Sequence, residues 1–225
     1  IVLEAIGGQR AADITAGALQ ALYNGIKDKT SDANAIRYIT LVKSIYSRSI
    51  EWGEFYGENP ALKVRLGQVD NHRLRFLSIE EIQRLLTAAS ENIFPFLVCA
   101  LMTGMRKGEI LGLQWADVDL EHRVIYVLNT KSGKPREIPV TDKLRETLLA
   151  LPGPHTGNVF KLTEPTLRFH FARALLRSGI TDCTIHTMRH TFASHFAMGT
   201  SNIPALQAIM GHATMKMTMR YAHLA

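Results

Sequence analysis

The sequence from residue 186 to residue 223, HTMRHTFASHFAMGTSNIPALQAIMGHATMKMTMRYAH, gathers side chains that stabilise or attack a phosphate. His186 and Arg189 stand three positions apart and therefore share one face of a helix. His212 follows a glycine that ends the next helix, and Tyr221 lies on the second turn of a third. A phenol has a pKa of about 10, so this tyrosine needs activation before it can act as a nucleophile. The stretch therefore predicts three consecutive helices suited to phosphodiester chemistry without a metal.

Two upstream motifs supply further positive charge. In residues 103–106 (TGMR), a glycine turn joins a buried helix to a shorter one. The guanidinium of Arg106 can offer a planar fork of donors to two phosphate oxygens, with Glu109 one turn later to hold it. In residues 130–136, Ser-Gly marks a β-hairpin tip from which Lys131 can protonate a leaving oxygen once its pKa is lowered. Taken singly, these motifs are also typical of an Arg–Glu helix cap and of an inert basic turn.

The histidines of residues 186–223 also raise the hypothesis of a metal site, which the sequence disfavours. His186 and His190 have the i, i+4 spacing of zinc helices, but Thr187 stands where zinc peptidases have a glutamate. No carboxylate side chain follows before the last residue. We therefore expect no metal and no other cofactor, and we expect His190 and His195 to satisfy local hydrogen bonds.

Composition sets wider bounds. The chain has 225 residues, of which 46% are hydrophobic, so it can form one large or two small domains with proper cores. An excess of 26 Lys and Arg over 20 Asp and Glu gives a net charge of +6, which favours a polyanionic partner without identifying nucleic acid.

The distant Cys99 and Cys183 suggest neither a metal site nor a disulfide and fit a reducing cytoplasm. The longest nearly uncharged stretch, residues 92–105, is too short to span a bilayer, so we expect no membrane-spanning segment and no membrane partner. Because the chain opens with Ile1, we expect a fragment of a longer protein.

The helical periodicity predicts two domains. Residues 1–65 are expected to form a helical domain with helices over 12–26 and 32–55, and residues 66–77 a basic linker to a second domain over 78–225. That second domain starts with a capping box at Ser78 and Glu81, followed by an entirely apolar helix over 93–102. We predict a mainly α fold with a small antiparallel β-sheet. Further helices are expected at 107–113, 142–150, 164–178, 186–197, 203–210 and 215–222, and strands at 118–120, 124–128 and 136–140.

Several basic residues outside the phosphate cluster are candidate DNA contacts. They lie on the outer face of the helix over 32–55, in the linker and on the hairpin. Such residues either form a solvated face or position a protein on a duplex without reading its sequence. The candidates are Arg37, Lys43, Arg48, Arg73, Arg75, Lys134 and Arg136.

Together these motifs resemble the tyrosine recombinase (phage integrase) family over residues 78–223. The resemblance rests on four segments in the family's order: TGMRKGEILGL (103–113), HTMRHTFAS (186–194), MGH (210–212) and MTMRYAH (217–223). Residues 1–65 resemble the family's helical core-binding domain less specifically, and they are expected to lack its first helix.

The resemblance implies a recombinase that clamps duplex DNA and needs neither cofactor nor ATP. Tyr221 would attack the scissile phosphate, form a 3′-phosphotyrosyl link and release a 5′-hydroxyl. Arg106, Arg189 and His212 would stabilise the charge on the phosphate. Lys131 would protonate the leaving 5′ oxygen, and His186 would assist proton transfer from the phenol. Glu109 and His190 would support these residues. Fixed cations can replace metals here because a phosphoryl transition state spreads its charge over equatorial oxygens. Four protomers would act on two DNA sites in the prokaryotic cytoplasm, and the protein without DNA would be monomeric.

Three alternatives stay open. A type IB topoisomerase shares the nucleophile and acts alone. A DNA-binding protein without cleavage activity would keep the basic surface, and a metal-dependent hydrolase would use the histidines differently.

Overall fold

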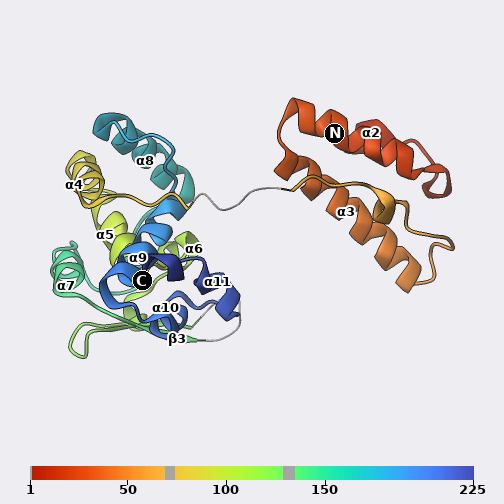
Figure 1. Ribbon diagram of the computed structural model, residues 1–225. Helices are drawn as coiled ribbons and strands as arrows, with labels where there is room; N and C mark the ends of the chain where they lie inside the picture. The colour runs from red at the N-terminus through yellow and green to blue at the C-terminus, as the bar shows by residue number, and fades with distance from the viewer. Residues whose placement is uncertain (1, 69–73, 129–134) are drawn as a thin grey trace. The chain divides into compact units, whose positions relative to one another are not determined.

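The computed structural model describes residues 2–68, 74–128 and 135–225 (Figure 1). The chain divides into two compact units, Ile1–Arg73 and Leu74–Ala225. Three of the candidate functional residues, Arg73, Lys131 and Lys134, lie outside the described residues.

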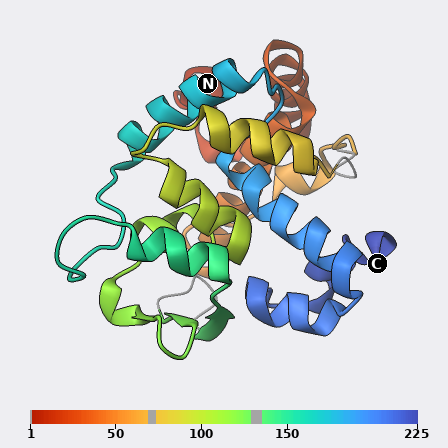
Figure 2. The same cartoon turned by 90° about the vertical axis from the view of Figure 1, so that its left-hand side faces the viewer.

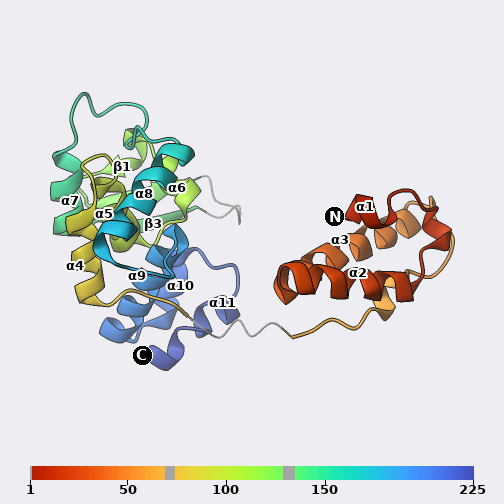
Figure 3. The ribbon, with the colours of Figure 1, turned by 90° about the horizontal axis from the view of Figure 1, so that it is seen from above.

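The first unit is a helical hairpin. Thr15 caps α2 by accepting a hydrogen bond from the backbone of Ala18, and Ser31 caps α3 in the same way. These two helices lie side by side and enclose the core of the unit (Figure 3). The predicted helix over 12–26 was therefore wrong at its start, because the cap lies at Thr15 and a 3-10 turn precedes it. The observed elements are α1 (Val2–Ile6), η1 (Ala11–Asp13), α2 (Ala16–Lys29), α3 (Asp32–Glu51) and η2 (Pro60–Lys63).

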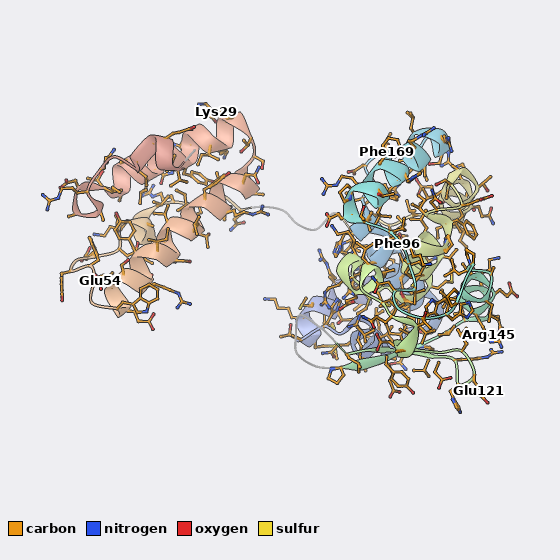
Figure 4. All side chains as sticks on the ribbon, turned by 180° about the vertical axis from the view of Figure 1, so that it is seen from behind. Lys29, Glu54, Phe96, Glu121, Arg145 and Phe169 are labelled. Carbon is orange, nitrogen blue, oxygen red and sulfur yellow. The ribbon has the colours of Figure 1, made fainter. Side chains whose placement is uncertain are left out.

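The second unit is built around a buried helix. The capping box is confirmed, since Ser78 and Glu81 each accept a hydrogen bond from the other's backbone and open α4 (Ile79–Ala88). The apolar helix is α5 (Phe94–Thr103), which packs against both α7 (Asp142–Leu149) and α9 (Ile185–Thr200) (Figure 2). Figure 4 shows Phe96 of this helix among the side chains that fill the unit.

Within the described residues, three strands form one antiparallel sheet in the order β1-β2-β3. The strands are β1 (Val118–Asp119), β2 (Val124–Val127) and β3 (Arg136–Pro139). Ile125 pairs with Ile138, and both side chains are buried in the core. The fold class predicted from sequence, mainly α with a small antiparallel sheet, is confirmed.

The C-terminal part of the second unit is helical. Its helices are α8 (Glu164–Ser178), α9, α10 (Ile203–Met210) and α11 (Met215–Met219), followed by the 3-10 helix η4 (Ala222–Leu224), and α6 (Lys107–Leu111) precedes the sheet. The predicted helix over 215–222 was wrong, because it ends at Met219. The backbone N–H of Tyr221 bonds to the carbonyl of Thr218, three residues back, so the chain tightens into 3-10 geometry. Tyr221 therefore lies in a turn between α11 and η4.

Tyr221 also belongs to a small apolar cluster. Its side chain is 1% exposed and packs with Ala193, Ala197, Leu206 and Met210. The tyrosine is thus held by α9 and α10. Every helix in the described ranges is too short or too polar to cross a membrane.

Candidate active site

Five of the six candidate catalytic residues line one pocket of about 410 Å³. The five are Arg106, His186, Arg189, His212 and Tyr221. The sixth, Lys131, lies outside the described residues. The pocket therefore brings together side chains from α5–α6, α9 and the turns on either side of α11.

Three more basic residues line the same pocket. His190, expected in a supporting place, lies there, and so do Lys216 and Arg220. Neither of these two cations was among the sequence candidates. Their nearness to Tyr221 along the last helical turns was the signal that could have identified them.

Arg189 is the most buried cation of the pocket, at 4% exposed. Its two terminal nitrogens donate to the carbonyls of Gly104 at 2.5 Å and Met210 at 2.6 Å. These carbonyls close the C-terminal ends of α5 and α10, where a cation is favoured by the helix dipole. Burial, with a smaller effect from Arg106, lowers the pKa of Arg189 to about 10, so the guanidinium stays charged at neutral pH.

Gly104 explains why the motif over residues 103–106 requires glycine. Its φ of +62° lies in the left-handed region, and a Cβ at this position would collide with the ring of Phe192. The turn that presents the Gly104 carbonyl to Arg189 therefore excludes other residues.

A buried carboxylate joins two arginines. Glu109 accepts from Arg106 at 2.9 Å and from Arg136 at 2.6 Å, and it also accepts from the Arg106 backbone. Burial raises the pKa of Glu109, but the hydrogen bonds from Arg136 and Arg106 outweigh it and leave the pKa below its ordinary value. The carboxylate is therefore ionised, as the predicted support of Arg106 requires.

Arg136 differs from its expected place on the DNA surface. Its side chain is 6% exposed, and its Nε donates to the carbonyl of Ile209 at 2.8 Å. Together with its bond to Glu109, this contact ties β3 to α6 and α10. The guanidinium is buried because it neutralises Glu109 and satisfies the end of α10.

His212 is held in the turn after Gly211, whose φ of +62° ends α10 as the sequence predicted. Its Nδ1 lies 2.9 Å from the hydroxyl of Thr218. Burial, with the charges of Arg189 and Arg106, lowers the pKa of His212 to about 4. This imidazole is therefore neutral at neutral pH.

The hydroxyl of Tyr221 contacts a histidine. It lies 2.7 Å from Nδ1 of His190, and the ring of His186 packs perpendicular to that of His190 with centroids 4.7 Å apart. Burial lowers the pKa of His190 to about 4, with His186 and Arg220 adding to the effect. Burial also lowers the pKa of His186 and raises that of Tyr221. All three groups are therefore uncharged at neutral pH.

The remaining candidate DNA contacts fall into two kinds. Arg37, Lys43 and Arg48 are exposed on α3, which fits both a solvated face and a phosphate-contacting one. Arg75 instead pairs with Glu81 at 2.6 Å beside the capping box of α4. Among residues 2–68, 74–128 and 135–225, there is no group of three or more His, Cys, Asp or Glu that could hold a metal ion.

Comparison with known proteins identifies related sequences. Residues 75–225 match the sequence model of the phage integrase family. The shufflon-specific DNA recombinase of Escherichia coli is 35% identical over 202 residues, which cover 87% of this chain and 52% of the relative. The integrase of Escherichia phage 186 is 34% identical, over 81% of this chain and 54% of the relative. The chain therefore spans about half the length of the curated relatives it matches.

Solved structures show the same fold. The catalytic domain of bacteriophage HP1 integrase is 38% identical, with a TM-score of 0.59 over 68% of this chain and 89% of that one. A lambda integrase bound to a core site is 21% identical, with a TM-score of 0.81 over 96% of this chain and 85% of that one. At that identity, the second likeness concerns the fold alone.

Proposed function

Because the chain belongs to the phage integrase family, we propose that it is a site-specific DNA recombinase. It cleaves and rejoins DNA strands through a 3′-phosphotyrosyl intermediate and needs no metal and no ATP. The observation that carries this proposal is the shared pocket, which Tyr221 lines together with the three arginines Arg106, Arg189 and Arg220.

The cations of the pocket suit a phosphoryl transition state. Attack by the Tyr221 oxygen places extra negative charge on the equatorial oxygens of the phosphate, and fixed donors stabilise this charge without reorganising. Arg189 is fixed by two carbonyls and Arg106 by Glu109, so both are preorganised. His212 donates a hydrogen bond as a neutral imidazole, and Lys131 protonates the departing 5′ oxygen.

The intermediate explains why no energy source is required. The phosphotyrosine keeps the energy of the cleaved phosphodiester, so a 5′-hydroxyl can reverse the attack at little cost in free energy. The reaction is therefore strand exchange rather than hydrolysis.

The partner in this proposal is double-stranded DNA. Residues 1–65 act as the core-binding domain, in which Arg37, Lys43 and Arg48 contact phosphates, and residues 78–225 act as the catalytic domain after a linker. A lambda integrase, 22% identical to this chain, has been solved as a tetramer on a Holliday junction. We extend that assembly to this protein as a homotetramer on two sites, formed from monomers in the cytoplasm of a prokaryote.

A covalent-trapping experiment tests the function. The target sites are first identified by sequencing DNA that is covalently trapped on the protein, and one site is then rebuilt with a nick near the cleavage position. The parent should form a protein–DNA adduct in EDTA. Tyr221→Phe should form none and bind the DNA as tightly as the parent, while Tyr126→Phe, at an exposed tyrosine of β2, should behave as the parent.

Each other outcome rejects a part of the proposal. An adduct with Tyr221→Phe would reject the nucleophile, and loss of cleavage in EDTA would favour a metal-dependent hydrolase. Relaxation of supercoiled DNA by a monomer, without strand exchange, would favour a type IB topoisomerase.

A further inference from the structure

We propose that His190, rather than His186, accepts the proton of the Tyr221 hydroxyl during cleavage and returns it during rejoining. This inference rests on the proposed recombinase function and assigns one of its proton transfers. His190 is then a catalytic residue, since its Nδ1 touches the oxygen that reacts.

The contact between these residues is held on both sides. His190 follows Arg189 on α9, and the guanidinium of Arg189 fixes this turn of the helix through the carbonyls of Gly104 and Met210. Tyr221 is 1% exposed and is packed by α9 and α10. The 2.7 Å distance therefore joins a buried phenol and a half-buried imidazole rather than two mobile surface side chains.

The surroundings of the pair keep the imidazole of His190 neutral, so that it can accept a proton. Burial lowers the pKa of His190, with further lowering from His186, Arg220 and Arg189, and the rings of His186 and His190 are perpendicular. A neutral imidazole carries one ring proton, and we place it on Nε2, which leaves Nδ1 free to accept the phenol hydrogen bond. A phenol O–H donates readily to such a nitrogen, so the bond already points along the path of proton transfer.

Cleavage exchanges one oxygen on phosphorus for another and moves two protons. The Tyr221 oxygen forms a bond to phosphorus while the bond from phosphorus to the 5′ oxygen breaks. The phenolic proton moves to Nδ1 of His190, which becomes an imidazolium, and the 5′ oxygen takes its proton from a separate acid, the role proposed for Lys131. In rejoining, the oxygen of a 5′-hydroxyl forms the bond to phosphorus and gives its proton to the group that acted as the acid, while the tyrosyl oxygen leaves phosphorus and recovers its proton from His190.

Substrate binding strengthens the acceptor. The phosphate anion enters the pocket that Arg189 and Arg220 line, and it offsets the field that these cations exert on His190. An offset positive field favours the protonated imidazole. His190 is therefore a weak base in the free protein and a better one when DNA is bound.

The first test replaces His190 by asparagine and by glutamine. Their amide oxygens can accept the phenol hydrogen bond but cannot take its proton. His190→Asn and His190→Gln should each slow adduct formation about 10²-fold or more, the range for loss of a general base. The matched control is His195→Asn on the same helix, where the ring bonds to the carbonyl of Leu77, and its rate should stay within about threefold of the parent.

The second test separates proton transfer from packing. Site-specific replacement of Tyr221 by a fluorinated tyrosine, which ionises more readily, should reduce the His190→Asn defect at least about tenfold. A nicked substrate with sulfur in place of the bridging 5′ oxygen has a leaving group that needs no proton. This substrate should relieve Lys131→Ala and leave the His190→Asn defect in place.

The outcomes distinguish this inference from the recombinase function. Adduct formation by the parent, together with a His190→Asn rate within about threefold of it, would overturn the role of His190 alone. A His190→Asn defect that fluorinated tyrosine does not reduce would also overturn the role of His190. So would a result in which fluorinated tyrosine relieves the defect of His186→Asn instead of that of His190→Asn. Absence of adduct from the parent would overturn the recombinase proposal and this inference together.

Discussion

Glu109→Gln removes a negative charge that two guanidinium groups share, while the size of the side chain is kept. Glu109 and Arg136 are 7% and 6% exposed and lie 2.6 Å apart, so this ion pair is buried. Arg106, the second partner, is 28% exposed and can recover part of its hydration. We therefore expect most of the loss to arise from Arg136, which keeps its charge and loses its counter-ion.

The size of the effect follows from that burial. Removal of one partner of a buried pair costs about 3–5 kcal/mol. For a unit of this size, each kcal/mol lowers the melting temperature by about 2–4 °C, so the expected fall is roughly 6–20 °C.

Glu164→Gln is the matched control. Glu164 also pairs with two cations, Lys107 at 2.6 Å and Arg168 at 3.0 Å, but these side chains are 39–79% exposed. Surface pairs of this kind contribute less than about 1 kcal/mol each. The two variants therefore differ in burial rather than in the number of ion pairs.

The assay is urea unfolding followed by tryptophan fluorescence. The chain has two tryptophans, of which Trp52 belongs to the first unit and Trp115 to the second. In a Trp52→Phe background, the signal reports the unit that contains Glu109. A loss below about 1 kcal/mol, or equal losses in both glutamine variants, would refute the reasoning from buried charge.

The pH dependence of this difference has a defined sign. The pKa of Glu109 in the folded state is below its ordinary value of 4.5, so its contribution is complete above that value and is lost as the pH falls through the lower one. Parent and Glu109→Gln should therefore differ most at neutral pH and converge in acid.

Three further predictions concern Arg189, Gly104 and His212. Arg189→Lys should slow adduct formation about 10²-fold or more, because an ammonium does not reproduce the planar fork, and a rate within about threefold of the parent would contradict this. Gly104→Ala should lower the free energy of unfolding by more than about 2 kcal/mol, because left-handed backbone alone costs about 1–2 kcal/mol and the added Cβ meets the ring of Phe192. The control is Gly108→Ala, in open space on α6, which should be neutral or stabilising. His212, whose pKa falls from 6.5 to about 4 on folding, should make stability decrease as the pH falls between those values, and a His212→Gln variant with an unchanged urea-unfolding pH profile would disprove it.

Local chemistry made much of the fold predictable. The capping box at Ser78 and Glu81 is complete within four residues, and the apolar run that became α5 cannot be solvated. Gly211 ends α10 with a positive φ, so His212 could be placed in its turn from the sequence. These features depend on neighbours along the chain, which a sequence displays directly.

Features set by distant contacts were not predictable in the same way. Arg136 was assigned to the DNA surface because its local context is a basic hairpin, but its partners Glu109 and Ile209 are 27 and 73 residues away. The contact between His190 and Tyr221 spans 31 residues and depends on the turn that replaced the predicted last helix. Their roles required the packing of β3, α9 and α10.

The bonds of Arg189 have a consequence for the ancestry of such chains. Its guanidinium joins the ends of α5 and α10 from inside α9, so under the proposed function natural selection for a folded protein and for a phosphate-binding cation acts on the same side chain. Tyr221 can lose its hydroxyl and keep its packing. Descendants that have given up strand cleavage should therefore retain the arginine and carry phenylalanine in place of the tyrosine.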